Sequence, residues 1–261
     1  VTFYPNPKSL ILGDDFQGHI SSKIENIDFI KKFNIDLLCI LKFNKHLKQM
    51  SASIFLNKVI SAFNPKLFIV GYNHYFGYNR EGDLSFLQKQ ARIFSFDVKE
   101  VSEHSHPVQG KISSSTIRKL ILNGEVAKAS NILGYKYSLK GKVGKGQGLG
   151  RKIGFPTANI ILNKDLKVLP KIGVYFIQSK INGEVFYGMC NIGVRPTVSS
   201  LNKISIEVYF FNLNFSLYNR TLNISFIKFL RDEKQFDNLE SLKKKLELDK
   251  NKCLEYSINN V

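Results

Sequence analysis

Glycines and basic side chains are concentrated in residues 141–152, directly before a group of hydroxyl and amide side chains. The stretch reads Gly-Lys-Val-Gly-Lys-Gly-Gln-Gly-Leu-Gly-Arg-Lys, and Pro156, Thr157 and Asn159 follow it. Glycines allow positive φ, so that successive backbone N–H groups can point into one concavity that suits phosphate oxygens. The candidate phosphate-binding residues are Gly144, Lys145, Gly146, Gly148, Gly150 and Arg151.

Thr157 and Asn159 are candidate ligands of a metal ion. They lie two residues apart, so on a strand they face the same side. Neutral oxygens beside phosphate oxygens suit Mg²⁺, which gives up its water reluctantly. The local interpretation is a nucleoside triphosphate with its metal. On composition alone a flexible surface loop is the commoner alternative, and the Gly-Lys-Ser or Gly-Lys-Thr ending of a P-loop is missing.

Glu207 is an acidic residue in the strand-like run Ile-Ser-Ile-Glu-Val-Tyr-Phe. On a strand it shares one face with Ser205 and Tyr209. Spacing alone favours a solvated sheet face, and the alternative is a carboxylate placed as a general base.

Five segments of the second half occur in the order typical of riboflavin kinases, and this half resembles that family. The segments are Gly154–Asn159 (Gly-Phe-Pro-Thr-Ala-Asn), Gly173–Tyr175, Asn191–Thr197, Ile206–Val208 with Leu217-Tyr218, and Phe229–Asp237. Asn219 stands where glycine is usual in the family.

The resemblance implies roles for several residues. Glu207 would be the catalytic base that accepts the proton of the riboflavin 5′-hydroxyl, and Thr157 and Asn159 would place Mg²⁺ with ATP. Arg231, with Phe229 and Phe236, would belong to a loop that closes over the flavin. Asn191, Gly193 and Thr197 are interpreted as a plain turn without a ligand.

The first half is similar to the FMN adenylyltransferase module of the bacterial bifunctional enzyme that carries both activities. Its matching segments are Thr2–Pro7, Val70–Asp83 and Ile112–Arg118. The resemblance places Asn73 and Arg80 on the flavin side of that module. Ser114, Thr116 and Arg118 lie at a helix start that suits phosphate oxygens, although ordinary capping explains the serines equally well.

The front half also departs from the family pattern. That module opens with a strand and a Gly-x-Phe-Asp-Gly-x-His-x-Gly-His motif, which this sequence lacks. His74 stands where the family has phenylalanine, and Asn6 replaces a histidine. We therefore expect a front module that is incomplete at its N-terminus and unsuited to adenylyl transfer, unless the motif lies upstream of Val1.

Composition limits the function classes. The formal net charge is +17, but the basic residues are spread along the chain, so nucleic-acid binding is not favoured over a small-molecule enzyme. A non-catalytic module that binds flavin or nucleic acid remains as the alternative class. Cys39, Cys190 and Cys253 are too widely spaced for a disulfide framework or a zinc pattern, which indicates the cytoplasm. No membrane segment or signal peptide is expected, and no pattern indicates an oligomeric state.

Helical and extended segments alternate before residue 113, which is typical of βαβ units. Extended runs are expected at 35–41, 67–70 and 98–101, with helices capped by Ser51 and Asp83. Ile54, Phe55, Val59 and Phe63 should face inward from the first of these helices.

Two short helices should follow over 113–134, capped by Ser114 or Ser115 and closed by Gly124 and Gly134. Six strand-like runs come next, at 139–143, 157–162, 174–181, 185–192, 204–211 and 222–229. A hairpin turn is expected at Asn182-Gly183, and the tail from Leu239 is helical. The predicted fold is a truncated, Rossmann-like α/β nucleotidyltransferase domain over 1–136. An all-β antiparallel split barrel with a C-terminal helix then covers 137–261.

Overall fold

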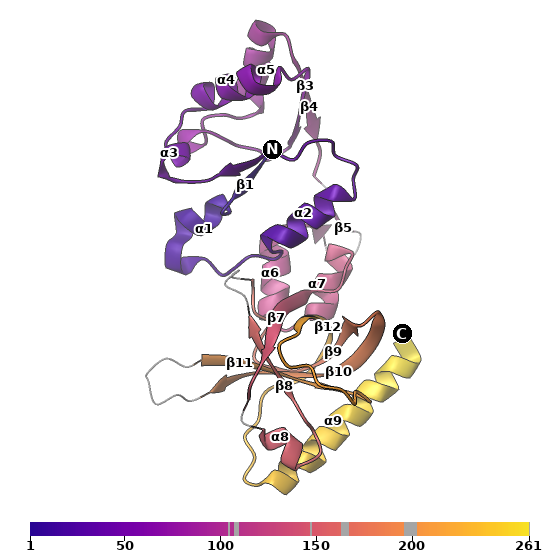
Figure 1. Ribbon diagram of the computed structural model, residues 1–261. Helices are drawn as coiled ribbons and strands as arrows, with labels where there is room; N and C mark the ends of the chain where they lie inside the picture. Colours follow the sequence, from indigo (N-terminus) through magenta and orange to yellow (C-terminus); the bar gives the residue numbers. More distant parts are fainter. Residues whose placement is uncertain (104, 107–109, 147, 163–166, 196–202, 261) are drawn as a thin grey trace. The chain divides into compact units, whose positions relative to one another are not determined.

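The computed structural model describes residues 1–261 apart from 104, 107–109, 147, 163–166, 196–202 and 261. Backbone contacts divide the chain into two units. The first comprises Val1–Gln17 and Lys23–Ile112, and the second comprises Gly18–Ser22 and Ser113–Val261 (Figure 1).

The first unit contains two pairs of parallel strands. Strand β1 (Thr2–Tyr4) pairs with β2 (Ile40–Lys42), and β3 (Leu67–Gly71) pairs with β4 (Asp97–Val101). Among the described residues these pairs form two separate sheets, while the edges of β1 and β3 both line an apolar cavity of about 220 Å³. The strand expected over 35–41 is wrong in extent, because the three residues of β1 give a partner only to residues 40–42.

Helices lie between and beside these strands, and two of them begin at a predicted cap. Ser51 Oγ accepts from the Ile54 N–H at 3.3 Å, and Asp83 Oδ1 accepts from the Phe86 N–H at 2.7 Å, so both predicted caps are confirmed. The remaining elements of this unit are α1 (Pro7–Leu12), η1 (Gly13–Asp15), α2 (Lys23–Lys31), α3 (Lys45–Lys48), α4 (Ala52–Phe63), η2 (Tyr78–Arg80), α5 (Leu84–Phe94), β5 (Ser105–His106) and β6 (Gly110–Lys111).

The core of the first unit forms around Leu56, with Val70, Leu87 and Phe96. The prediction that Ile54 and Phe63 face inward is wrong, because their side chains are 53% and 44% exposed. The buried face of α4 instead passes through Ala52 and Leu56, which stand four residues apart on one side of the helix.

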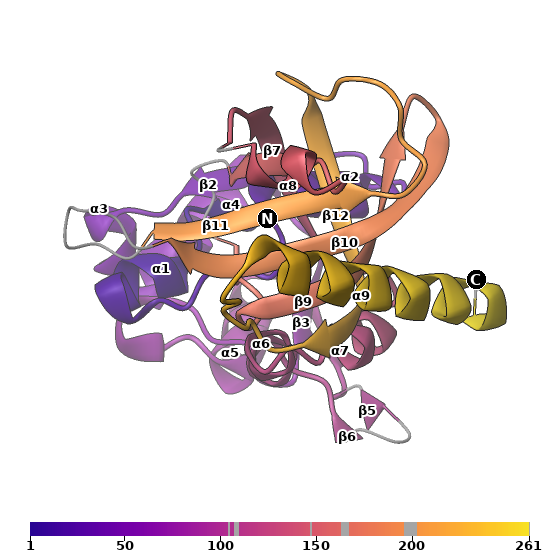
Figure 2. The same cartoon turned by 90° about the horizontal axis from the view of Figure 1, so that it is seen from below.

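The second unit is a closed six-stranded antiparallel barrel, with strand order β10-β11-β8-β7-β12-β9 (Figures 1 and 2). All six predicted strands occur, and Asn182 (φ 53°) and Gly183 (φ 91°) form the predicted hairpin turn. The strands are β7 (Ser138–Gly144), β8 (Ala158–Leu162), β9 (Gly173–Ile181), β10 (Glu184–Arg195), β11 (Lys203–Phe210) and β12 (Thr221–Arg231).

Helices α6 (Ser114–Leu122) and α7 (Val126–Leu133) belong to this second unit. The cap predicted at Ser114 or Ser115 is wrong by one residue: Ser113 has extended backbone, and its Oγ accepts from the Thr116 N–H at 3.1 Å. Gly124 and Gly134 follow α6 and α7 at positive φ, as expected for residues that end helices.

The barrel wall separates two apolar clusters. Ile206 and Val208 of β11 point into the interior, together with Cys190 and Ile192 of β10. The opposite faces of these strands carry Met189 and Tyr209, which pack with residues of the predicted C-terminal helix α9 (Leu239–Asn260). Figure 2 shows α9 lying along β9 and β10. Alternation along β11 therefore places Glu207 on the outer face of the barrel, the face on which α9 packs.

Candidate active site

Paired positions form a row of polar side chains across the barrel. Asn159 of β8 faces Glu207 of β11, and Glu207 faces Asn191 of β10. Residues directly opposite in an antiparallel pair point to the same face, with Cβ atoms about 5 Å apart. The row therefore places a carboxylate between two amides. Asn191 and Gly193, interpreted as part of a turn, instead lie within β10, and Thr197 lies outside the described residues.

The structure brings together the three residues on which the sequence analysis depends. Thr157 Oγ1 donates to Glu207 Oε2 at 3.2 Å, while Asn159 faces Glu207 in register. Glu207 and Asn159 are half-buried, and Thr157 is exposed. A carboxylate at this place can accept a proton from a hydroxyl group that approaches the outer face of the barrel.

The donor set suits a hard cation that also binds phosphate. Thr157 and Asn159 offer neutral oxygens beside the carboxylate of Glu207, and Mg²⁺ is commonly held by few protein oxygens together with phosphate oxygens. In the described part of the chain, no group of three or more His, Cys, Asp or Glu residues could hold a metal ion. A metal ion at Thr157 and Asn159 would take its remaining ligands from phosphate oxygens and water.

The glycine-rich loop before β8 packs closely on the strand that it precedes. A Cβ atom at Gly146 would lie 1.9 Å from Asn159 Nδ2, and one at Gly150 would lie 2.2 Å from the carbonyl oxygen of Phe155. Gly148 (φ 72°) begins the short helix α8 (Leu149–Lys152). These close approaches explain why glycine is needed here, whatever the loop binds. Lys145 and Arg151 are exposed on the same loop.

A cavity of about 420 Å³ adjoins Thr157 and the loop residue Arg151. Its apolar walls include Val143 of β7, Phe210 of β11, and Leu217. The volume lies within the range of small-molecule sites, which are typically apolar with a few polar groups. Residues 213–218 carry no pattern that predicts a site, although the Leu217-Tyr218 pair contributes to the family resemblance.

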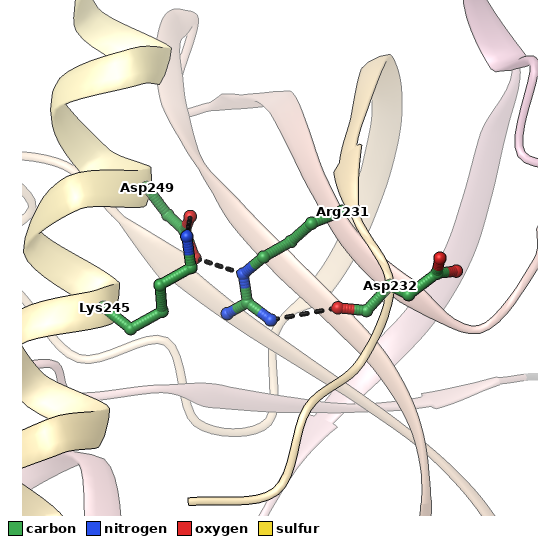
Figure 3. Close-up of polar contacts among 4 residues, drawn as sticks. All are labelled: Arg231, Asp232, Lys245 and Asp249. Atoms are coloured by element: carbon green, nitrogen blue, oxygen red, sulfur yellow. Dashed lines mark hydrogen bonds and ion pairs between the residues drawn. The ribbon is translucent and has the colours of Figure 1, made fainter.

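Arg231 ends β12 and is bound to α9 (Figure 3). Its Nε donates to Oδ2 of Asp249 at 2.7 Å, and its terminal nitrogen donates to the carbonyl oxygen of Asp232 at 3.0 Å. Lys245 lies 3.4 Å from the other oxygen of Asp249, whose side chain is only 1% exposed. The ring of Phe236 lies 5.9 Å from the guanidinium carbon. Asp249 and Lys245 could not be recognised from the sequence, because in a lysine-rich helix they resemble ordinary surface charges.

Phe229 is in a different environment from Arg231 and Phe236. Its ring meets that of Tyr175 edge-on at 5.2 Å, and the β12–β9 register shifts between Phe229 and Arg231. A Cβ atom at Gly124 would lie 3.2 Å from Phe229. Of the three candidate flavin-binding residues, Arg231 and Phe236 therefore lie together, whereas Phe229 lies against the turn between α6 and α7.

Cys190 lies on the inner side of the wall that carries Glu207. Complete burial raises the pKa of its thiol well above the ordinary value, and the nearby Glu207 carboxylate raises this pKa further. The thiol is therefore protonated at neutral pH. A buried, protonated thiol is a poor nucleophile, which leaves Glu207 as the reactive group at this place.

The front-half candidates fall in both units. In the first unit, Asn73 is exposed after β3, and the Arg80 guanidinium lies 4.3 Å over the Tyr75 ring. Arg80 also lines a cavity of about 510 Å³ whose walls include Phe3 and Phe55.

Ser114, Thr116 and Arg118 lie in the second unit and make their contacts within it. Arg118 Nε donates to the carbonyl oxygen of Gly18 at 3.2 Å, and a terminal nitrogen donates to the carbonyl oxygen of Ser114 at 3.3 Å. The Thr116 hydroxyl lies 2.9 Å from that of Ser113. These contacts fix the start of α6 and hold residues 18–22 against the second unit.

Two family models match this chain. The model described as FAD synthetase matches residues 1–116, and the model described as riboflavin kinase matches residues 133–257. Among the described residues, no helix is both long and apolar enough to cross a bilayer.

A solved structure described as a macrolide-efflux protein from Streptococcus pneumoniae superposes with a TM-score of 0.85. It is 29% identical to this chain and covers 96% of it, while the chain covers 81% of that structure. The likeness supports the fold of each of the two units.

Three relatives are described as bifunctional riboflavin kinase/FMN adenylyltransferase. The Buchnera aphidicola (subsp. Schizaphis graminum) protein is 32% identical over 95% of this chain and 80% of its own length. The Bacillus subtilis protein is 31% identical over 99% and 82%, and the Escherichia coli K12 protein is 30% identical over 95% and 78%. The chain belongs to the family of bifunctional riboflavin kinases/FMN adenylyltransferases.

Proposed function

We propose that this chain transfers the γ-phosphoryl group of Mg²⁺–ATP to the 5′-hydroxyl of riboflavin, giving FMN and ADP. The observation that carries the proposal is the row in which Glu207 faces Asn159 and accepts a hydrogen bond from Thr157. In this row a carboxylate that can accept a proton lies beside Thr157 and Asn159, the two residues expected to hold the metal of a triphosphate. A cavity of about 420 Å³ adjoins Thr157.

Glu207 acts as the general base. Its carboxylate takes the proton of the 5′-hydroxyl while the hydroxyl oxygen forms a bond to the γ-phosphorus, and the bond from that phosphorus to the β,γ-bridging oxygen breaks. Both electrons of the broken bond leave with ADP. Most of the acceleration then comes from alignment and charge neutralisation, as in other phosphoryl transfers.

The nucleotide occupies the glycine-rich loop and the adjoining cavity. Lys145, Arg151 and the backbone of Gly144, Gly146, Gly148 and Gly150 receive the phosphates, and the apolar cavity walls receive the purine. Thr157 and Asn159 would hold Mg²⁺, which neutralises phosphate charge when it is bound.

The flavin lies on the other side of Glu207, toward Asn191. Arg231 and Phe236 form its wall at the end of β12, where a cation and an aromatic ring can both stack on an isoalloxazine. Phe229 packs against Tyr175 instead and does not form part of this wall.

The experiment is an incubation of the purified full chain with riboflavin, ATP and MgCl₂, followed by chromatographic separation of flavins. FMN should form in proportion to enzyme and should cease when EDTA is added. A folded protein that forms no FMN under these conditions would contradict the proposal.

The match of residues 1–116 to FAD synthetase favours a second activity, adenylyl transfer from ATP to FMN to give FAD and pyrophosphate. The aromatic-walled cavity beside Arg80 is the place we assign to its flavin. Arg80→Ala should lower FAD formation from FMN while FMN formation from riboflavin continues. No observation favours a non-catalytic module.

We further propose that the adenylyltransferase portion spans 1–136 and the kinase portion 137–261, and that the protein works in the cytoplasm. Cys39, Cys190 and Cys253 carry free thiols, which agrees with a reducing compartment.

A further inference from the structure

Three consecutive side chains at the end of β12 are held by three different parts of the second unit. Arg231 binds Asp249 of α9 at 2.7 Å, and Asp232 binds Lys171, which precedes β9, at 2.6 Å. Glu233 Oε1 accepts from Asn191 Nδ2 of β10 at 3.1 Å. Helix, loop and barrel wall thus converge on residues 231–233.

The glycine at position 193 of β10 leaves room for the contact between Glu233 and Asn191. Gly193 stands two residues after Asn191, on the same face of β10. A Cβ atom at Gly193 would lie 2.0 Å from Glu233 Oε1 and 3.0 Å from Asn191 Nδ2. The φ of Gly193 is not positive, so this glycine is explained by the space that the Glu233 carboxylate occupies rather than by backbone conformation.

The contact between Asn191 and Glu233 lies at the end of the row of polar side chains that contains Glu207. Asn191 faces Glu207 in register on the side opposite Asn159, so Glu233 is fixed next to the side from which an alcohol would approach. Asn191 thus faces one carboxylate-bearing residue, Glu207, and donates a hydrogen bond to the other, Glu233.

We infer that Asn191 and Glu233 are positioning residues for the alcohol substrate. Their contact holds residues 231–236 against β10 and so fixes the wall on which the flavin ring rests while its 5′-hydroxyl meets Glu207. This inference rests on the proposed kinase function and deepens it, because it assigns substrate placement to two residues that belong neither to the nucleotide loop nor to the proposed metal ligands Thr157 and Asn159.

The test is a double-mutant cycle with Asn191→Ala, Glu233→Ala and the double variant, together with Gly193→Ala. Riboflavin binding is measured without ATP by quenching of flavin fluorescence, and KM is measured for both substrates. Each single variant should weaken riboflavin binding by about three- to tenfold, the size expected for loss of one ordinary hydrogen bond at an exposed site. The double variant should be no weaker than the worse single variant, because both remove the same contact.

Gly193→Ala should reproduce the loss without removing either polar group, and KM for ATP should stay within about twofold in all variants. Glu240→Ala on α9, which removes an exposed ion pair with Lys244, is the control and should change neither constant. Thermal unfolding shows which variants are folded, and Asn191→Asp, which sets a carboxylate against that of Glu233, replaces any alanine variant that is not.

The inference is overturned if the two single effects multiply in the double variant, if KM for ATP rises as much as KM for riboflavin, or if the wild-type chain does not bind riboflavin. Riboflavin binding without FMN formation would instead refute the kinase function alone, because the binding cycle still measures the contact.

Discussion

At the scale of single residues, the site depends on side chains that come together across strands. Thr157 and Asn159 could be predicted as a pair, because a spacing of two places them on one face of one strand. Their approach to Glu207 could not, because it depends on the β8–β11 register. For Glu207 itself, spacing favoured a plain surface residue, and only the family resemblance indicated a base.

Gly146 gives a prediction about the placement of Asn159. The added methyl of Gly146→Ala would displace the Asn159 amide, to which it would lie 1.9 Å away. We expect kcat/KM for Mg²⁺–ATP to fall by about tenfold, corresponding to about 1.4 kcal/mol, and the Mg²⁺ concentration for half-maximal rate to rise. Steady-state kinetics with a Mg²⁺ titration measures both effects.

Gly71→Ala is the matched control, because its new Cβ would meet nothing nearer than 3.9 Å and its φ is not positive. It should leave kinase kinetics unchanged. Equal loss of activity in the two variants would contradict a specific role for the contact between Gly146 and Asn159.

At the scale of elements, the strands of the barrel could be predicted from the sequence, whereas the extent of β2 and the start of α6 could not. Alternating apolar residues and the Asn182-Gly183 turn indicated all six strands, because one face of each packs inward. The short β2 and the cap at Ser113 were not predicted correctly, since strand extent depends on a partner and the start of a helix depends on local backbone geometry. The clamp between Arg231 and Asp249 joins elements that no local pattern connects.

This clamp should contribute to stability. Asp249→Ala leaves the mostly buried Arg231 without its carboxylate partner, so we expect the free energy of unfolding to fall by about 2–4 kcal/mol. Urea denaturation measures it. Glu240→Ala removes an ion pair whose side chains are 73% and 78% exposed, and should cost less than about 0.5 kcal/mol. Similar losses in the two variants would show that burial of the pair does not matter.

At the scale of the whole molecule, buried thiols and a buried phenol should make the protein less stable in alkali. Burial raises the pKa of Cys190 and Tyr175 above their ordinary values and raises that of Cys253 from 9.0 to about 12. In the unfolded chain these groups ionise at their ordinary pKa values. Stability is therefore fully present below about pH 9 and declines as pH rises through the raised values, by up to about 1.4 kcal/mol per pH unit and group.

Cys190→Ala should show a shallower decline in the free energy of unfolding between pH 9 and about pH 11 than the wild-type chain, whatever its stability at pH 7. The measurement is urea denaturation at a series of pH values. Cys39→Ala is the control, because that thiol is only half-buried. A parallel decline in all three proteins would show that the Cys190 thiol is not the cause.

The most direct test of the central claim is the turnover of Glu207→Gln with riboflavin and Mg²⁺–ATP. The amide keeps the shape of the side chain and can still accept from Thr157, but it cannot take a proton. We predict that kcat falls by about 10²–10⁴-fold while the dissociation constants of riboflavin and ATP stay within about threefold of wild type. A kcat within about threefold of wild type would show that Glu207 is not the base and would contradict the account.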